Sequence, residues 1–307
     1  MLQPVGRHVW QGVAHVSAGG QGDPSGASVA LVVVRDGPRT WLLGSGPTPA
    51  FGAALACAVW RDTGHVVTDV INTRAQAELA LGNAAFPRAR LWALAGVARA
   101  MRRQCPQCLA RMKARLGAVG DSLQPTAIRV PPFRVDRVDR VDHVDHLHRM
   151  DHLGRAGAPT GRLGPFRWWA LQRAPGSPVL VLQHRADRIV IAQGLLWPGA
   201  VPDLRDTTLA DMRNSLVHLQ ALAMDHRLVG DVGAADPLGS PADVASHLAY
   251  LDALQRAVSQ ALQRGDVEAH APAAQALPDF ASLAWYDERH PLNVQRAWRE
   301  LEAAVFR

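Results

Sequence analysis

The chain of 307 residues is long enough for one large domain with a sizeable core. Hydrophobic residues make up 48% and charged residues 20%, the balance of a soluble globular protein. Lys and Arg together number 33 against 27 Asp and Glu, and Lys113 is the only lysine. Because no basic helical face carries interleaved aromatic residues, the excess arginine is interpreted as solvated surface charge, and we expect no nucleic-acid partner.

The sequence also excludes a membrane protein and a disulfide scaffold. It has no run of about 18 apolar residues that would form a transmembrane helix, and its N-terminal segment lacks the apolar region of a signal peptide. Three cysteines, Cys57, Cys105 and Cys108, are too few for a disulfide framework. We therefore expect a cytoplasmic protein with no membrane partner.

The first third of the chain predicts a hairpin followed by a helix. Two β-rich runs within residues 28–46 flank Asp36-Gly37-Pro38, a sequence typical of a tight turn. The small and apolar residues that follow end at Gly64, which predicts a helix with a glycine C-cap. Two further predicted segments are a strand at 66–71 and a helical region at 89–117, which Pro106 is placed to interrupt.

Residues 134–153 read "RVDRVDRVDHVDHLHRMDHL" and repeat with a period of three. Neither a helix nor a strand buries one clean face with this period, so the repeat predicts a disordered surface loop. We assign 134–160 as a low-complexity insertion in a single domain that spans 1–307. Histidines in this tract bind transition metals weakly, or they are incidental to the expansion.

The second half of the chain predicts strands and then helices. The predicted strands are 166–171, 179–184 and 188–193, and 226–233 is predicted as a short strand and loop. The predicted helices are 207–223, a long one beginning at Ser240, and a C-terminal one with Trp298 on its apolar stripe. The order of predicted elements is strands and a helix, then a long middle segment, then strands and a helix again. This order predicts two similar α/β halves. These halves pack sheet on sheet with helices outside.

Four blocks of the sequence resemble the metallo-β-lactamase-fold hydrolases. "INTRAQAELALGNAAF" (71–86) resembles the loop in which an Asn-Thr pair precedes H-x-H-x-D-H, and "LLGSGPTPAFGAAL" (42–55) resembles the strand-turn-helix of that family. "LVGDVGAADPL" (228–238) resembles its late G-H-G loop. The tail "RHPLNVQRAWRELE" (289–302) is similar to the quinoprotein relay system zinc metallohydrolase subgroup, whose genes lie near alcohol-oxidation systems. The resemblance covers residues 8–307 and implies an αββα four-layer sandwich.

The resemblance implies a zinc cofactor, but the residues at the ligand positions are unsuited to it. The H-x-H-x-D-H ligands fall on Arg74, Gln76, Glu78 and Leu79, the G-H-T histidine on Arg173, the bridging aspartate on Gly194, the last histidine on Asp231, and the strand-end aspartate of 42–55 on Gly44. Zinc takes imidazole nitrogen, thiolate and carboxylate oxygen, whereas arginine has no lone pair to give. We therefore predict no zinc, no catalytic residues of the family's kind, and a pocket at these positions.

Charged residues at the ligand positions suggest a replacement for the metal. Our hypothesis pairs Arg74 with Glu78, and Arg173 with Asp231, in a network that holds the loops together. Two arginines converging on one pocket favour a small anionic ligand such as a carboxylate or a phosphate.

The pair Cys105-Pro106-Gln107-Cys108 has three open interpretations. It is a redox pair if it lies at a helix start, where a thiol pKa is lowered. It is half of a zinc knuckle only if a partner exists, and the sequence contains no second C-x-x-C. Otherwise the two cysteines are reduced and packed in a helical region.

Three functions follow from these observations. The first is a non-hydrolytic protein of this fold that binds a small anion or a protein partner. The second is a metal-dependent hydrolase of an ester, thioester or lactam with a rebuilt centre. The third is a scaffold in a quinoprotein alcohol-oxidation pathway, with the insertion as its contact arm. No nucleotide cofactor is expected, because the sequence has no G-x-G-x-x-G or P-loop motif.

Overall fold

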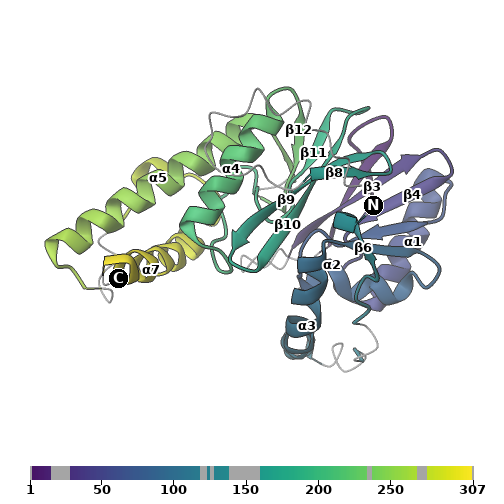
Figure 1. Cartoon of the computed structure of the whole chain (residues 1–307), viewed down its shortest axis with the longest axis horizontal. Helices are drawn as coiled ribbons and strands as arrows, with labels where there is room; N and C mark the ends of the chain where they lie inside the picture. Colours follow the sequence, from purple (N-terminus) through teal and green to yellow (C-terminus); the bar gives the residue numbers. More distant parts are fainter. Residues whose placement is uncertain are drawn as a thin grey trace.

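Two β-sheets lie between helices in the computed structural model, which describes residues 2–14, 28–117, 123–124, 128–137, 160–233, 237–267 and 275–305. Figure 1 shows α1 beyond one sheet and α4, α5 and α7 beyond the other. This arrangement confirms the predicted αββα sandwich.

The first sheet combines antiparallel and parallel strands. Its order is β1 (Gln3–Pro4), β2 (Val9–Ala14), β3 (Val29–Asp36), β4 (Arg39–Leu43), β5 (Asp69–Ile71), β6 (Arg90–Ala93) and β7 (Phe133–Arg134). Strands β1 to β4 pair antiparallel and β4 to β7 pair parallel. The helices of this half are α1 (Pro49–Thr63), α2 (Ala77–Ala80) and α3 (Ala95–Leu116), with a short 3-10 turn at Leu81–Ala85.

The second sheet and three helices form the other half of the sandwich. Its order is β13 (Leu238–Gly239), β12 (Arg227–Val229), β11 (Ile189–Ile191), β10 (Ser177–His184), β9 (Phe166–Ala174) and β8 (Thr160–Leu163). Helices α4 (Leu209–Ala223), α5 (Pro241–Arg264) and α7 (Tyr286–Val305) pack on its outer face. Short 3-10 turns occur at Val135–Arg137 and Pro278–Phe280.

The central strands β3 and β4 are buried on both faces, which explains their continuous apolar runs. In β3, Leu31 and Val33 pack with α1, whereas Val32 and Val34 pack between the sheets. Trp41 is fully buried in the core between the sheets. These central strands therefore contribute to two layers of core.

Most of the predicted elements are confirmed, with three differences. The helical region predicted at 89–117 begins only at Ala95, because Arg90–Ala93 form β6, which pairs with β5. Gly37 has a φ of 54° at the hairpin turn, and Gly64 caps α1 with a φ of 72°. Helix α3 continues through Pro106, so the predicted interruption is wrong. The strand predicted from residue 66 begins only at Asp69, because Val66 lies before the paired register and is exposed.

The ends of the predicted insertion lie in regular structure. Val135 is buried in the core between the sheets, and Asp136 accepts a hydrogen bond from the Ala95 N–H at the start of α3 (3.0 Å). Thr160 begins β8. The first four residues of the repeat, 134–137, are therefore ordered, which differs from the predicted disorder. Residues 138–159 of the insertion lie outside the described residues. Within the described part of the chain, no helix has the length and apolarity to span a bilayer.

Candidate functional site

A buried network of amides fixes the loop that follows β5. Asn83 Nδ2 donates to Asn72 Oδ1 (2.7 Å), and Ser45 Oγ donates to Asn83 Oδ1 (2.8 Å). Asn72 Nδ2 donates to the carbonyl oxygen of Leu79 (3.1 Å). All three polar side chains are fully buried, so their mutual hydrogen bonds are required to offset the loss of water. They hold residues 72–83 against the start of the strand-turn-helix segment.

The same loop is tied to the second sheet. Thr73 Oγ1 donates to Gln193 Oε1 (2.7 Å), and the carbonyl of Thr73 accepts from Leu180 N (2.8 Å). Gln193 lies two residues after β11 and Leu180 lies on β10, so these bonds bring the end of β5 against the second sheet. Arg74 and Gly194, the next residue on each segment, are thereby placed side by side.

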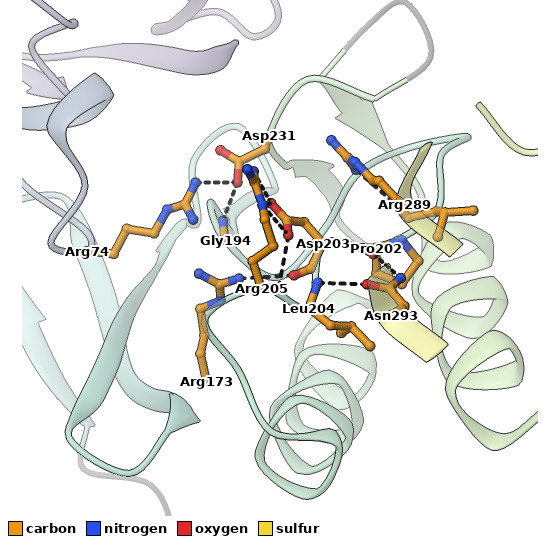
Figure 2. Close-up of polar contacts among 11 residues, drawn as sticks. Arg74, Arg173, Gly194, Pro202, Asp203, Leu204, Arg205, Asp231, Arg289 and Asn293 are labelled. Atoms are coloured by element: carbon orange, nitrogen blue, oxygen red, sulfur yellow. Dashed lines mark hydrogen bonds and ion pairs between the residues drawn. The ribbon is translucent and has the colours of Figure 1, made fainter. Parts of the chain in front are cut away.

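Arg74 forms the ion pair at the centre of the site (Figure 2). Its Nη2 lies 2.7 Å from Asp231 Oδ2, and the Gly194 N–H donates to the same oxygen (2.8 Å). The side chains of Arg74 and Asp231 are only 11% and 2% exposed. Asp231 therefore has Arg74 as its hydrogen-bonding cation. Arg173, the partner expected from the sequence, interacts with Asp231 electrostatically.

Gly194 makes room for the Arg74 side chain. Its φ is +85°, and a Cβ added there would lie 2.8 Å from Arg74 Cδ and 3.0 Å from Nε. This is the position where the resemblance implies a bridging aspartate. A side chain at 194 would therefore have to displace the guanidinium of Arg74 from its ion pair with Asp231.

We expect Gly194→Ala to lower the free energy of unfolding by about 2 kcal/mol, since it adds crowding against Arg74 to backbone strain. Gly176→Ala is the matched control, because Gly176 has a similar φ of +73° with no atom near its Cβ position. Urea unfolding of both variants separates the two effects. Equal losses in the two proteins would contradict crowding by Arg74.

Arg173 is the second buried arginine of the site. Its Nη2 donates to the carbonyl oxygen of Asp203 (3.1 Å), and its guanidinium carbon lies 5.9 Å from the centre of the Trp197 ring. Burial lowers the pKa of Arg173 to about 10, and the positive charge of Arg74 acts in the same direction. Its Nε is buried and has no acceptor among the described residues.

The loop at 201–205 and helix α7 add two more arginines. Arg205 binds Asp203 through both carboxylate oxygens (2.7–3.1 Å). Burial opposes the charge of Asp203, but the hydrogen bonds and charge of Arg205 outweigh it and lower the pKa of that carboxyl to about 2. Arg289 donates to the Val201 carbonyl (2.7 Å), and burial lowers its pKa to about 10.

We call Arg74, Arg173, Arg205 and Arg289 the arginine cluster; Figure 2 shows them together with Asp203 and Asp231. The sequence analysis identified only Arg74 and Arg173. Arg289 opens the tail segment 289–302, and its neighbour Asn293 holds the same loop by donating to the Pro202 carbonyl (2.8 Å) and accepting from Leu204 N (3.3 Å). The polar residues of the tail could have indicated this anchoring role from the sequence.

The other predicted pocket residues lie differently. Leu79 is fully buried in the layer between the first sheet and α1, where it contacts the Gly44 position, so it faces away from the arginine cluster. Gln76 precedes α2 and is partly buried. Glu78, on α2, interacts electrostatically with Arg205 and with Arg111 of α3. The charge of Glu78 therefore acts on Arg205 of the site. In the hydrogen bond of Arg74 described above, the acceptor is Asp231 and not Glu78.

The site does not fit zinc. Across the described ranges, no group of three His, Cys, Asp or Glu side chains is placed to hold a metal ion. The space beside Asp231 is filled by the guanidinium of Arg74, a permanent cation without a lone pair. No catalytic step is therefore assigned to a metal here.

Comparison with known proteins supports the fold alone. No model of a known protein family and no curated sequence matches the chain. Among solved structures, the mono-zinc form of the metallo-β-lactamase FIM-1 from Pseudomonas aeruginosa is 13% identical, with a TM-score of 0.59 over 82% of this chain and 94% of that one. The metallo-β-lactamase from Hirschia baltica is 10% identical, with a TM-score of 0.58 over 82% and 96%. That from Erythrobacter litoralis, with β-mercaptoethanol in its active site, is 14% identical, with a TM-score of 0.57 over 82% and 95%. The chain has the metallo-β-lactamase fold.

Proposed function

We propose that this protein is a non-hydrolytic member of the metallo-β-lactamase fold that binds a small anion through its arginine cluster. The observation that carries the proposal is the pair of buried arginines Arg173 and Arg289. Both are nearly inaccessible to solvent, at 6% and 5% exposure, and neither forms an ion pair with a carboxylate among the described residues.

The unused donors of these arginines favour an anion over a neutral ligand. Asp231 is engaged by Arg74 and Asp203 by Arg205, and both carboxylates act on Arg173 and Arg289 electrostatically. In the described part of the chain, the hydrogen bonds of Arg173 and Arg289 go to backbone carbonyls. Nε of Arg173, and Nε and Nη2 of Arg289, are buried without an acceptor among the described residues. A buried cation with unused N–H donors is costly, and a carboxylate or phosphate oxygen compensates both deficits.

Trp197 defines where such a ligand would bind. The guanidinium carbons of Arg173 and Arg289 lie 5.9 and 5.8 Å from the centre of its ring. Trp285 covers Arg289 from another side, with the guanidinium carbon 4.0 Å from its ring centre. Aromatic surfaces lower the local dielectric constant, which strengthens each hydrogen bond from arginine to an anion.

The test is binding of phosphate and of acetate at constant ionic strength, set with chloride. We expect either anion to raise the melting temperature, and Arg173→Met to weaken binding at least tenfold in calorimetric titration. The control is Arg213→Met, which removes an exposed arginine on α4 that pairs with Asp252. If neither anion shifts the melting temperature, or if both variants bind equally well, the proposal is wrong.

Metal analysis separates this proposal from the hydrolase with a rebuilt centre. The purified, untagged protein is incubated with zinc and dialysed, and its metal content is measured by elemental mass spectrometry. We expect no stoichiometric zinc, because Arg74 fills the space beside Asp231. Tightly held zinc would favour the hydrolase, and turnover of esters, thioesters and lactams would then be measured.

A further inference from the structure

Helix α3 carries two cysteines on one side, outside the arginine cluster. Cys105 and Cys108 are three residues apart within Ala95–Leu116. Ideal helix geometry puts their Cα atoms about 5 Å apart, which is inside the range that a disulfide spans. Their sulfur atoms are therefore close enough to react after a small local adjustment.

The two thiols have different surroundings. Cys105 is 1% exposed and belongs to the core between the sheets. Burial, with a contribution from Cys108, raises the pKa of the Cys105 thiol to about 12. Cys108 is partly exposed, and Nη2 of Arg111 lies 3.4 Å from its sulfur. Cys108 is the more accessible of the two sulfur atoms, so it is assigned as the nucleophile and Cys105 as the protected partner.

Pro106 lies between the two cysteines and loosens the helix there. It has no N–H to donate to the carbonyl of Arg102, so one helical hydrogen bond is missing at this turn. Side chains three apart on a helix have Cβ atoms about 5–6 Å apart, whereas a disulfide needs about 4 Å. Closing that gap strains the helix, and a strained disulfide is easily reduced again.

We propose that Cys105 and Cys108 form a reversible dithiol–disulfide pair that is oxidised by peroxide. The Cys108 thiolate attacks one oxygen of hydrogen peroxide, the O–O bond breaks, and the displaced hydroxide leaves as water after taking a proton. This gives a sulfenic acid on Cys108. The sulfur of Cys105 then attacks the Cys108 sulfur, an S–S bond replaces the S–O bond, and a second water leaves with the thiol proton. Two electrons pass from the two thiols to the peroxide.

Thiol mapping after peroxide treatment tests the pair, with Cys57 as an internal control. Cys57 lies on α1 and is exposed. Remaining thiols are alkylated, and the protein is digested with trypsin, which places Cys105 and Cys108 in one peptide, residues 104–111. We expect this peptide to lose the mass of two hydrogen atoms and to regain it with dithiothreitol, while Cys57 is still alkylated.

Two variants assign the roles. Cys108→Ser is expected to abolish the disulfide and to leave Cys105 unoxidised. Cys105→Ala, which keeps a small apolar side chain in the core, is expected to accumulate a Cys108 sulfenic acid that dimedone traps. The proposal is overturned if Cys57 is oxidised as fast as Cys108, or if both cysteines of peptide 104–111 are alkylated after peroxide treatment. It is also overturned if Cys105 reacts in the Cys108→Ser protein.

Discussion

Replacing Arg74 with methionine is expected to lower the free energy of unfolding by about 3–5 kcal/mol, the usual cost of removing one partner of a buried ion pair. The Asp231 carboxylate is 2% exposed and would keep only the Gly194 N–H as a hydrogen-bond donor (2.8 Å). Its other oxygen, Oδ1, already has no donor among the described residues. Urea unfolding followed by circular dichroism measures the loss.

A second substitution distinguishes lost charge from lost packing. Asp231→Asn in the Arg74→Met background removes the unpaired charge and keeps an oxygen for the Gly194 N–H, so it is expected to recover much of the stability. Arg213→Met is the matched control: its ion pair with Asp252 is exposed, and its loss is expected to cost less than about 1 kcal/mol. If Arg74→Met were as stable as Arg213→Met, the ion pair would not hold the loops together.

Arg74 and Gly194 together connect the two sheets at the site. Here a long side chain from the β5 loop crosses to Asp231, and Gly194 supplies both the space and a backbone N–H for the same carboxylate oxygen. This ion pair connects the ends of strands from both sheets, as a shared metal ion would.

The fold was predictable from the sequence, because several features agreed locally. The hairpin at Gly37, the cap at Gly64 and the apolar runs of the strands each specify one structure. The predicted start of the β5 strand was wrong, because pairing with the neighbouring strand sets that boundary. Val66 belongs to a β-rich run, yet β5 starts at Asp69 because only residues 69–71 lie opposite β4.

The pairing within the site was less predictable for a physical reason. Arg74 and Asp231 are 157 residues apart in sequence, and a long flexible side chain has several carboxylates within reach. Motif alignment gave the positions of both residues but not their contact. Asp203 and Arg205 were missed because they lie on an irregular loop, which α7 holds through Arg289 and Asn293.

Acidification from pH 7 to pH 4 is expected to cost about 3 kcal/mol of stability through His247 alone. Burial lowers the pKa of this histidine from 6.5 to about 4, with Asp243 opposing and Arg289 assisting the shift. Its Nε2 accepts the Trp197 N–H (3.1 Å), so the fold requires the neutral ring with its proton on Nδ1. His247 binds a proton at a higher pH in the unfolded chain than in the folded protein. Its contribution to the free energy of unfolding is therefore fully present above about pH 6.5 and is lost as the pH falls toward 4.

His247→Gln should flatten this pH dependence, because a glutamine oxygen can accept the Trp197 N–H without titrating. The matched control is His218→Gln, which changes a histidine on the surface of α4 and should keep the wild-type slope. Burial also lowers the pKa values of His184, His226 and His290, so a smaller slope is expected to persist in His247→Gln. Equal slopes in the two variants, measured by urea unfolding between pH 7 and pH 4, would contradict the assignment.

The position of His247 links acid stability to the anion site. Its ring stacks on Trp197, with centroids 6.2 Å apart and an interplanar angle of 17°. Arg173 and Arg289 lie near the same indole. Protonation would put a third positive charge beside Trp197 and remove the acceptor that holds its backbone. An anion bound at Arg173 and Arg289 would offset part of that charge, so sulfate, whose charge is constant over this range, should protect the protein more at pH 5 than at pH 7, and Arg173→Met should remove this difference.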